Sequence, residues 1–248
     1  MTARAEGGRS AERGSRTSAC FVVLACAIAS LATAPASAQV GLSASIFSDA
    51  RFRGYSLSGE HPVASFDFAY DDRSGAYAGG AATVLLKGEY PEPLSLQVDA
   101  GYARRLGSGT TFDVGIAHAN YGSYSRGRHG SSYTELYGGI ARGRLSSRLS
   151  ISPHYFATGQ WTAYGEVNGN VSPASEWTLD GHVGMLVPLR TPAGLSARSG
   201  LDWSVGATRS IGRLSLHATW TDRTPGHDFY ARRPGGRNAL VLGASVAL

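Results

Sequence analysis

The feature that most constrains the fold of this chain is a regular alternation of apolar and polar residues in long segments. In 94–102, apolar side chains occupy every second position from Leu94 to Tyr102, and small or polar residues stand between them. This two-residue period is that of a β-strand with one apolar face. The pattern predicts twelve strands, at 40–49, 63–71, 75–86, 94–104, 111–121, 132–142, 145–156, 161–171, 176–187, 201–210, 214–222 and 238–248.

The predicted strands are longer than those of most globular proteins. Globular strands usually have about 5–6 residues, whereas a tilted strand that crosses a bilayer needs about 9–11. Short turns such as 72–74 and 212–213 alternate with longer connections such as 50–62 and 223–237, and only 157–160 breaks this order. We therefore predict an all-β fold, a transmembrane antiparallel up-and-down β-barrel with both termini on the periplasmic side.

Alternation alone does not say which face of a barrel points outward. A soluble barrel buries its apolar face, and a secreted sandwich or lectin-like domain remains an alternative. The length of the strands and a polar face rich in Gly, Ser, Thr and acidic residues favour an apolar face that meets lipid. Aromatic residues near the segment ends favour the same orientation, as in the aromatic belts of membrane proteins. The residues that we expect in such belts are Tyr70, Tyr102, Tyr121, Tyr155, Trp161, Trp177 and Trp220.

Residues 1–38 have the features of a secretory signal peptide. Arginines precede an apolar run at 19–34, which is followed by a small-residue cleavage site that ends at Ala38. We expect cleavage there, which leaves a barrel at 39–248 in the outer membrane of a Gram-negative bacterium. An uncleaved anchor and a lipoprotein signal at Cys26 are the alternatives. The two cysteines of the chain both lie in this leader, so the sequence excludes a disulfide or zinc scaffold.

A resemblance to a known family begins directly after the first predicted strand. The segment 48–58 reads SDARFRGYSLS, and 66–68 and 74–79 read FDF and SGAYAG. Over 40–85 the chain resembles the TorF-type porin family of proteobacterial outer-membrane barrels. The resemblance implies a barrel with channel function, and it implies no substrate or catalytic residue. The residues that carry the motif are Ser48, Asp49, Phe52, Arg53, Gly54, Ser56 and Ser58.

The end of the chain departs from a common pattern of such barrels. Many outer-membrane barrels end in Phe, whereas this chain ends in Leu248. Leu240, Leu242 and Val246 keep the alternation of a terminal insertion signal. We expect the barrel insertion machinery to be a partner during biogenesis.

If the apolar face meets lipid, the polar face lines a lumen that is rich in carboxylates. An acidic lumen raises the local concentration of cations and repels anions. A small cation-preferring pore follows from this. The alternative is a closed barrel in which the same side chains pair with Arg and Tyr. The residues that we expect to line the lumen and set its selectivity are Asp67, Asp99, Asp113, Glu135, Arg148, Glu166, Asp180, His182, Asp202 and His217.

The predicted outer connections are basic. Arginine binds phosphate well through its planar guanidinium, so a rim that contacts lipopolysaccharide is one interpretation and a solvated loop surface is the other. We expect no nucleic-acid partner, because the arginines are scattered among turns of an exported chain. The basic residues of these connections are Arg51, Arg53, Arg126, Arg128, Arg190, Arg198, Arg223, Arg232, Arg233 and Arg237.

Signatures of an enzyme are weak. The chain holds no G-x-S-x-G and no H-E-x-x-H motif, and only the pair His227–Asp228 in the last connection is worth a test for hydrolysis at the rim. We expect no catalytic residue, cofactor or metal. The sequence thus predicts a passive diffusion channel for small solutes or ions, surrounded by outer-membrane lipid and lipopolysaccharide. The alternative is a closed barrel with a structural, adhesive or lipopolysaccharide-contacting role.

Overall fold

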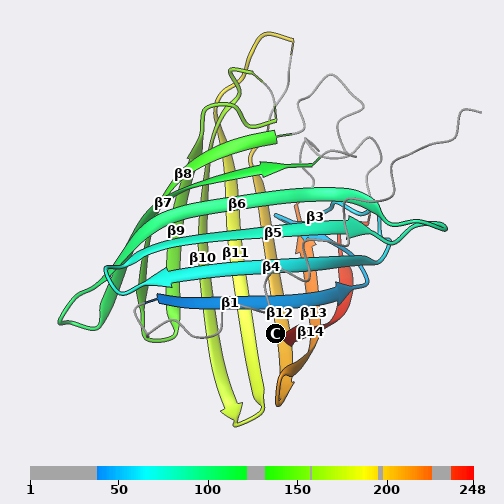
Figure 1. Ribbon diagram of the computed structural model, residues 1–248. Coiled ribbons are helices and arrows are strands. Elements are labelled where there is room, and N and C mark those ends of the chain that lie inside the picture. The colour runs from blue at the N-terminus through cyan, green and yellow to red at the C-terminus, as the bar shows by residue number, and fades with distance from the viewer. Residues whose placement is uncertain (1–37, 122–131, 157, 195–197, 225–235) are drawn as a thin grey trace, which may run out of the picture. The chain divides into compact units, whose positions relative to one another are not determined.

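The structure, a computed structural model, describes residues 38–121, 132–156, 158–194, 198–224 and 236–248 (Figure 1). Within these ranges the chain forms one closed barrel of twelve antiparallel strands, which belongs to the unit Ala38–Leu248. The barrel strands are β1 (Ala38–Phe47), β4 (Val63–Asp72), β5 (Ala76–Leu85), β6 (Glu92–Arg105), β7 (Thr110–Asn120), β8 (Ser132–Arg142), β9 (Leu145–Ser152), β10 (Trp161–Ala174), β11 (Trp177–Arg190), β12 (Gly200–Ile211), β13 (Leu214–Arg223) and β14 (Ala239–Ala247).

All twelve predicted strands are confirmed, most boundaries agree within two residues, and three strand ends differ by three residues or more: those of β9, β10 and β11, the last of which ends at Arg190 rather than at 187. The strand predicted at 145–156 ends at Ser152, because Pro153 has no N–H group for the ladder. The connection that follows is therefore long, which restores the alternation of short and long connections. The strand predicted at 161–171 continues to Ala174, with a pairing irregularity after Val171 that accommodates Pro173.

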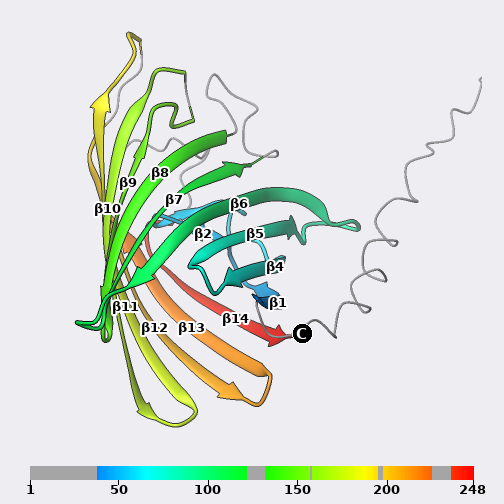
Figure 2. The same ribbon diagram turned by 60° about the vertical axis from the view of Figure 1, so that its left-hand side comes forward.

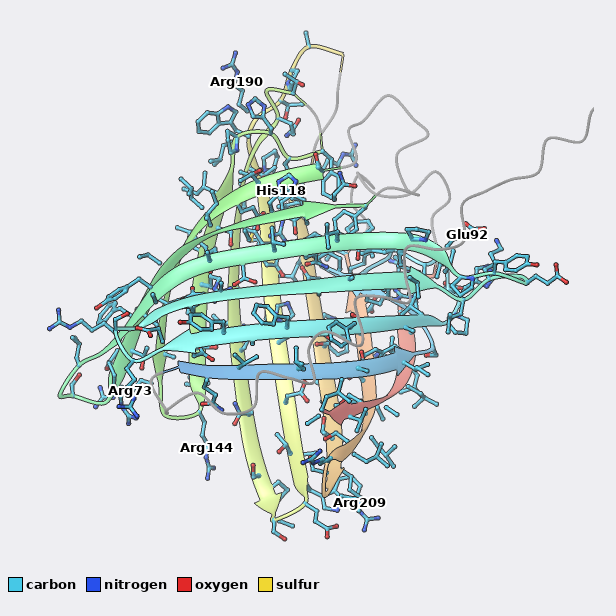
Figure 3. All side chains as sticks on the ribbon, viewed as in Figure 1. Arg73, Glu92, His118, Arg144, Arg190 and Arg209 are labelled. Atoms are coloured by element: carbon cyan, nitrogen blue, oxygen red, sulfur yellow. The ribbon has the colours of Figure 1, made fainter. Side chains whose placement is uncertain are left out.

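The barrel closes where the first and last strands pair. β1 pairs with β14 from Ser43↔Ala247 to Phe47↔Gly243, and with β4 along its whole length. Closure leaves no open sheet edge, which a barrel in lipid requires. In Figure 3, Arg73, Arg144 and Arg209 lie at the end of the strands that short turns join, and Glu92 and Arg190 lie at the opposite end.

The apolar face of the wall points outward. Leu136, Val114 and Val205 are 63%, 59% and 58% exposed, and the outward positions of the other strands are similarly apolar. The polar residues that alternate with them point inward. This arrangement is the inverse of a water-soluble barrel and is typical of a barrel surrounded by lipid. In the described part of the chain, no helix is long and apolar enough to cross a membrane.

The aromatic residues at the strand ends divide into two groups. Trp161, Trp177 and Trp220 are on the outer face, each more than two-fifths exposed, as expected for an aromatic belt. The prediction is wrong for Tyr121 and Tyr155, which are completely buried. Both lie just beyond a strand end and pack inside the barrel against the first long connection.

That first connection, 48–62, folds into the barrel rather than away from it (Figure 2). It contains a small hairpin of two short strands, β2 (Arg51–Phe52) and β3 (Tyr55–Ser56). Arg53 and Gly54, between them, have φ angles of +49° and +77°. Two left-handed residues in succession are the requirement of a tight two-residue hairpin turn. We call residues 48–60 the inward hairpin.

Glycines on the inner face make room for aromatic rings from neighbouring strands. A Cβ atom added at Gly115 would collide with the Tyr137 ring, and one added at Gly184 would collide with Tyr164. Each ring thus lies across the inner face of the sheet and covers a glycine of the adjacent strand. The same arrangement pairs Tyr77 with Gly101 and Phe47 with Gly243.

Candidate functional site

The inward hairpin is held in shape by one buried carboxylate. Asp49 Oδ1 accepts hydrogen bonds from the hydroxyls of Ser56 and Ser58, each at 2.6 Å. Its Oδ2 accepts one from Arg51 Nε, also at 2.6 Å. Hydrogen bonds to a charged acceptor are stronger than neutral ones. The residues of the sequence motif thus fix the conformation of the hairpin.

Arg53 stands at the tip of the hairpin and reaches the opposite wall. Its Nη2 lies 2.7 and 2.9 Å from the two carboxylate oxygens of Glu135 on β8, and Nη1 donates to the Tyr155 hydroxyl at 2.8 Å. The guanidinium also lies over the Tyr164 ring, 3.9 Å from its centroid. Burial disfavours the charge, but Tyr155 and Glu135 favour it more strongly, so the pKa of Arg53 lies above its usual value. The Arg53 guanidinium therefore stays charged.

An aromatic cluster surrounds this ion pair. Phe52 stacks on Tyr133 with ring centroids 5.6 Å apart, and Tyr133 and Tyr155 each contact Phe156. Tyr121 packs against Phe52 from the end of β7. The hairpin is thereby fixed to the side of the barrel that β7–β10 form.

The turn of the hairpin also contacts the wall at β12 and β13. A Cβ atom at Gly54 would lie 2.8 Å from the Cβ of Arg223 and 3.1 Å from that of Asp202. The Arg223 guanidinium lies over the Tyr55 ring at 4.0 Å. Position 54 therefore requires glycine for two reasons: its φ angle is positive, and a Cβ atom there would collide with Arg223 and Asp202.

A polar cavity of about 620 Å³ lies inside the barrel beside the hairpin. Its wall consists mainly of Ser and Thr residues from β1, β4, β5, β6, β12, β13 and β14. Asp67, His182, Asp202 and His217 also line it, together with hairpin residues. The cavity offers hydroxyl oxygens and carboxylates to a solute, and Phe47, Val63 and Val241 add apolar surface to its wall.

Two networks of inward polar residues lie along the wall. In the first, His182 Nε2 is 3.0 Å from Asp202 Oδ1, and the Tyr164 hydroxyl donates to the same carboxylate. His182 Nδ1 lies 2.7 Å from Asn168 Oδ1 and 3.8 Å from Glu166. Both ring nitrogens of His182 thus have hydrogen-bond partners, which fix the orientation of the ring.

The second network lies on β5, β7, β8 and β9. Arg148 Nη2 donates to Asp113 at 3.0 Å, and the guanidinium lies over the Tyr137 ring. The Tyr77 hydroxyl is 2.7 Å from that of Tyr137 and 3.3 Å from Asp113. This network pairs a predicted lumen acid with the predicted lumen arginine.

The remaining predicted lumen residues have weaker contacts. Asp67 accepts a hydrogen bond from Ser43 at 3.5 Å, and His217 lies between Thr208 and Ser245. Asp99 lies over Gly79, and Asp180 over Gly206. The strand alternation places all ten predicted residues on the inward face: Asp67, Asp99, Asp113, Glu135, Arg148, Glu166, Asp180, His182, Asp202 and His217. Their role in selectivity stays a prediction.

The interpretation of the basic connections as an outer rim is wrong for three arginines. Arg51, Arg53 and Arg223 have buried side chains that face the interior, because each has a carboxylate or an aromatic ring to pack against there. Arg126, Arg128, Arg232, Arg233, His227 and Asp228 lie outside the described residues.

Sequence reasoning missed the inward direction of the first connection. The signal for it was the presence of Phe52, Tyr55 and Leu57 in a segment predicted to face water. Across the described ranges, no group of His, Cys, Asp and Glu side chains is arranged to hold a metal ion.

Comparison with known proteins agrees with the fold. The sequence model of a family described as "Bacterial protein of unknown function (Gcw_chp)" matches residues 31–243. No curated protein sequence matches the chain. Solved structures with a similar fold include KdgM porin in complex with disordered oligogalacturonate (9% identity, 85% of this chain, 99% of that chain, TM-score 0.52). NanC porin is also similar (9% identity, 85% of this chain, 100% of that chain, TM-score 0.55). The chain therefore has the barrel fold of these porins.

Proposed function

This chain belongs to the Gcw_chp family of bacterial proteins of unknown function, and on that premise we propose that it is an outer-membrane, porin-like channel for passive diffusion of small solutes. The closed barrel with an outward apolar face supports a position in lipid. The fold shared with KdgM and NanC porins supports the same proposal. Outer-membrane lipid, lipopolysaccharide and the barrel insertion machinery are its proposed partners, and the TorF-type resemblance over 40–85 is in accord with it.

One observation carries the proposal. The inward hairpin is fastened to β8, its turn contacts β12 and β13, and a cavity of about 620 Å³ lies beside it. A barrel interior that served only as a packed core would be filled by side chains. Here a hydroxyl-lined cavity lies beside the hairpin, which supports a lumen that the hairpin narrows without filling.

We further propose that the channel prefers cations. Among the seven predicted lumen acids, Glu135 pairs with Arg53 and Asp113 with Arg148. Asp67, Asp99 and Asp180 have no basic side chain within 4.0 Å among the described residues. Carboxylates without a neutralising partner give the lumen a negative potential, which concentrates cations.

The second candidate is a closed barrel with a structural, adhesive or lipopolysaccharide-contacting role. The observation that favours it is the dense packing around Arg53, where Tyr121 and Tyr155 are completely buried. Such packing on both sides of the hairpin would block diffusion. The pair His227–Asp228, on which rim hydrolysis would depend, lies outside the described residues.

Single-channel current across a planar bilayer tests the proposal. The full chain is expressed, and the barrel is purified from outer membranes and checked by its heat-dependent shift on a gel. We expect stable current steps and a reversal potential that shows cations to be more permeant. The Asp99→Asn and Asp180→Asn variants should lower that preference. Glu176→Gln is the matched control, because it removes a carboxylate from an exposed turn. A correctly folded barrel without current would support the closed barrel.

A further inference from the structure

The two sides of the lumen differ in what they offer a solute. On the side of β8–β10, Tyr155 and Gln160 are completely buried and Thr162 is 1% exposed. The Arg53 guanidinium points to this side, and its side chain and that of Glu135 are each 7% exposed. Arg51 and Arg53 border the cavity, but each is paired with a carboxylate, so the pairs add little net charge to the lumen.

On the side of β1 and β4–β6 the inner face is open and rich in hydroxyls. Ser43, Ser65 and Thr83 line the cavity, and Thr83 donates to Ser65 at 3.3 Å. Gly79 and Ala81 on β5 have little or no side chain. β5 lies between β4, which carries Asp67, and β6, which carries Asp99. The small side chain of Ala81 lies opposite Asp67, whereas the Asp99 carboxylate itself covers Gly79.

Asp67 is distinctive among the carboxylates that line this cavity. Asp49 is paired with Arg51, and Asp202 is bonded by Tyr164 and His182. In the described part of the chain, Asp67 Oδ2 accepts a hydrogen bond from the Ser43 hydroxyl at 3.5 Å. Asp67 stands at the middle of β4, so its carboxylate lies at mid-height of the barrel wall, half-buried and facing the cavity.

From these observations we infer that cations cross the barrel along the wall of β1 and β4–β6, and that Asp67 is the residue that selects them. This inference rests on the proposed channel function and names the path and the solute class. A carboxylate among hydroxyl oxygens replaces part of the hydration shell of a monovalent cation, or accepts the N–H donors of a small organic ammonium ion. The long 3.5 Å contact to Ser43 leaves the carboxylate free to exchange partners.

The first test compares two carboxylates by their effect on selectivity. Asp67→Asn keeps the shape of the side chain and removes its charge. We expect the cation-to-anion permeability ratio to fall at least about twofold, and block of potassium current by propylammonium to weaken. Asp180→Asn, near the end of the strands that short turns join, should lower the ratio less. A folded Asp67→Asn channel with unchanged selectivity would overturn the inference while the channel function stands. A silent wild-type barrel would instead overturn the channel function and, with it, the inference.

A second measurement covers the case in which Asp67→Asn does not fold. With Cys20→Ser and Cys26→Ser the chain has no thiol. The reaction of a single introduced cysteine with a thiol reagent then measures the accessibility of that one position. Ser65→Cys introduces a nearly isosteric thiol on the cavity wall, two residues from Asp67. A methanethiosulfonate reagent with a trimethylammonium group should modify it and lower the cation preference. Ser150→Cys, at a 6% exposed position on β9, is the control and should stay unmodified. Modification at 150 but not at 65 would place the path on the other side and refute the inference.

Discussion

Nη2 of Arg53 lies 2.7 and 2.9 Å from the two carboxylate oxygens of Glu135, although 82 residues separate them in the chain. One residue comes from the first connection and the other from the inner face of β8. Their side chains are each 7% exposed. This pair fastens the inward hairpin to the far wall, so its removal should affect both stability and current.

Arg53→Ala should destabilise the barrel because it leaves Glu135 buried without its counter-charge. Loss of one partner of a buried pair costs about 3–5 kcal/mol. Urea unfolding in lipid vesicles, followed by tryptophan fluorescence, measures this change. The double variant Arg53→Met with Glu135→Leu should recover much of the loss, since no charge remains buried. If the double variant is as unstable as the single one, the ion pair is not what holds the hairpin.

Gly54→Ala should be more damaging than Gly59→Ala. Both glycines have positive φ angles, +77° and +64°, so both variants strain the backbone. Only at Gly54 would the new Cβ meet Arg223 and Asp202, at 2.8 and 3.1 Å, whereas nothing lies within 4 Å of it at Gly59. We expect an additional loss of about 1–3 kcal/mol for Gly54→Ala, measured by the same unfolding assay. Equal losses would show that the turn does not press against β12 and β13.

Asp49→Asn should loosen the inward hairpin. In Asn one of the two carboxylate oxygens becomes an NH2 group that cannot accept, so the side chain loses either the bond from Arg51 or the bonds from Ser56 and Ser58. We expect more current noise in the open channel and a wider spread of conductance levels. The control is Ser210→Ala, which removes an exposed hydroxyl at the opposite end of the barrel. Quiet, wild-type-like current from Asp49→Asn would show that the hairpin does not depend on this carboxylate.

Gly115→Ala should destabilise the barrel, whereas Gly165→Ala should be tolerated. A methyl group at position 115 would overlap the Tyr137 ring, and none of the atoms near Gly165 lies within 4 Å of such a group. Overpacking of this kind costs about 1–3 kcal/mol. The temperature at which the folded gel band disappears compares the two variants. Similar temperatures would mean that Tyr137 moves aside at no cost.

The barrel was predictable from the sequence because its strands are specified locally. A two-residue period such as Leu94, Leu96 and Val98 needs no distant information, and the outward direction of these side chains follows from the length of the strands. The shorter β9 was also within reach, since Pro153 marks its end. Local rules thus account for all twelve strands and for the inward direction of the ten polar residues.

The inward hairpin was not predictable because the residues that hold it are distant in the chain. Arg53 meets Glu135 and Tyr155, and Gly54 meets Asp202 and Arg223. In sequence, an arginine in a long connection looks the same whether it faces water or a lumen. Tyr121 and Tyr155 were assigned to aromatic belts for the same reason, since their true neighbour, the hairpin, could not be placed beforehand.

The hairpin has a consequence for the order in which the molecule is assembled. Its base is joined to the last strand, where Ser48 N donates to Leu242 O at 2.8 Å and Leu242 N donates to the Ser48 hydroxyl. Arg51 donates to the backbone oxygens of Gly236 and Arg237, just before that strand. Contacts between distant parts of a chain form only after the segments between them are in place. The first connection is therefore complete only when β14 has joined the sheet, so its last contacts form as the barrel closes.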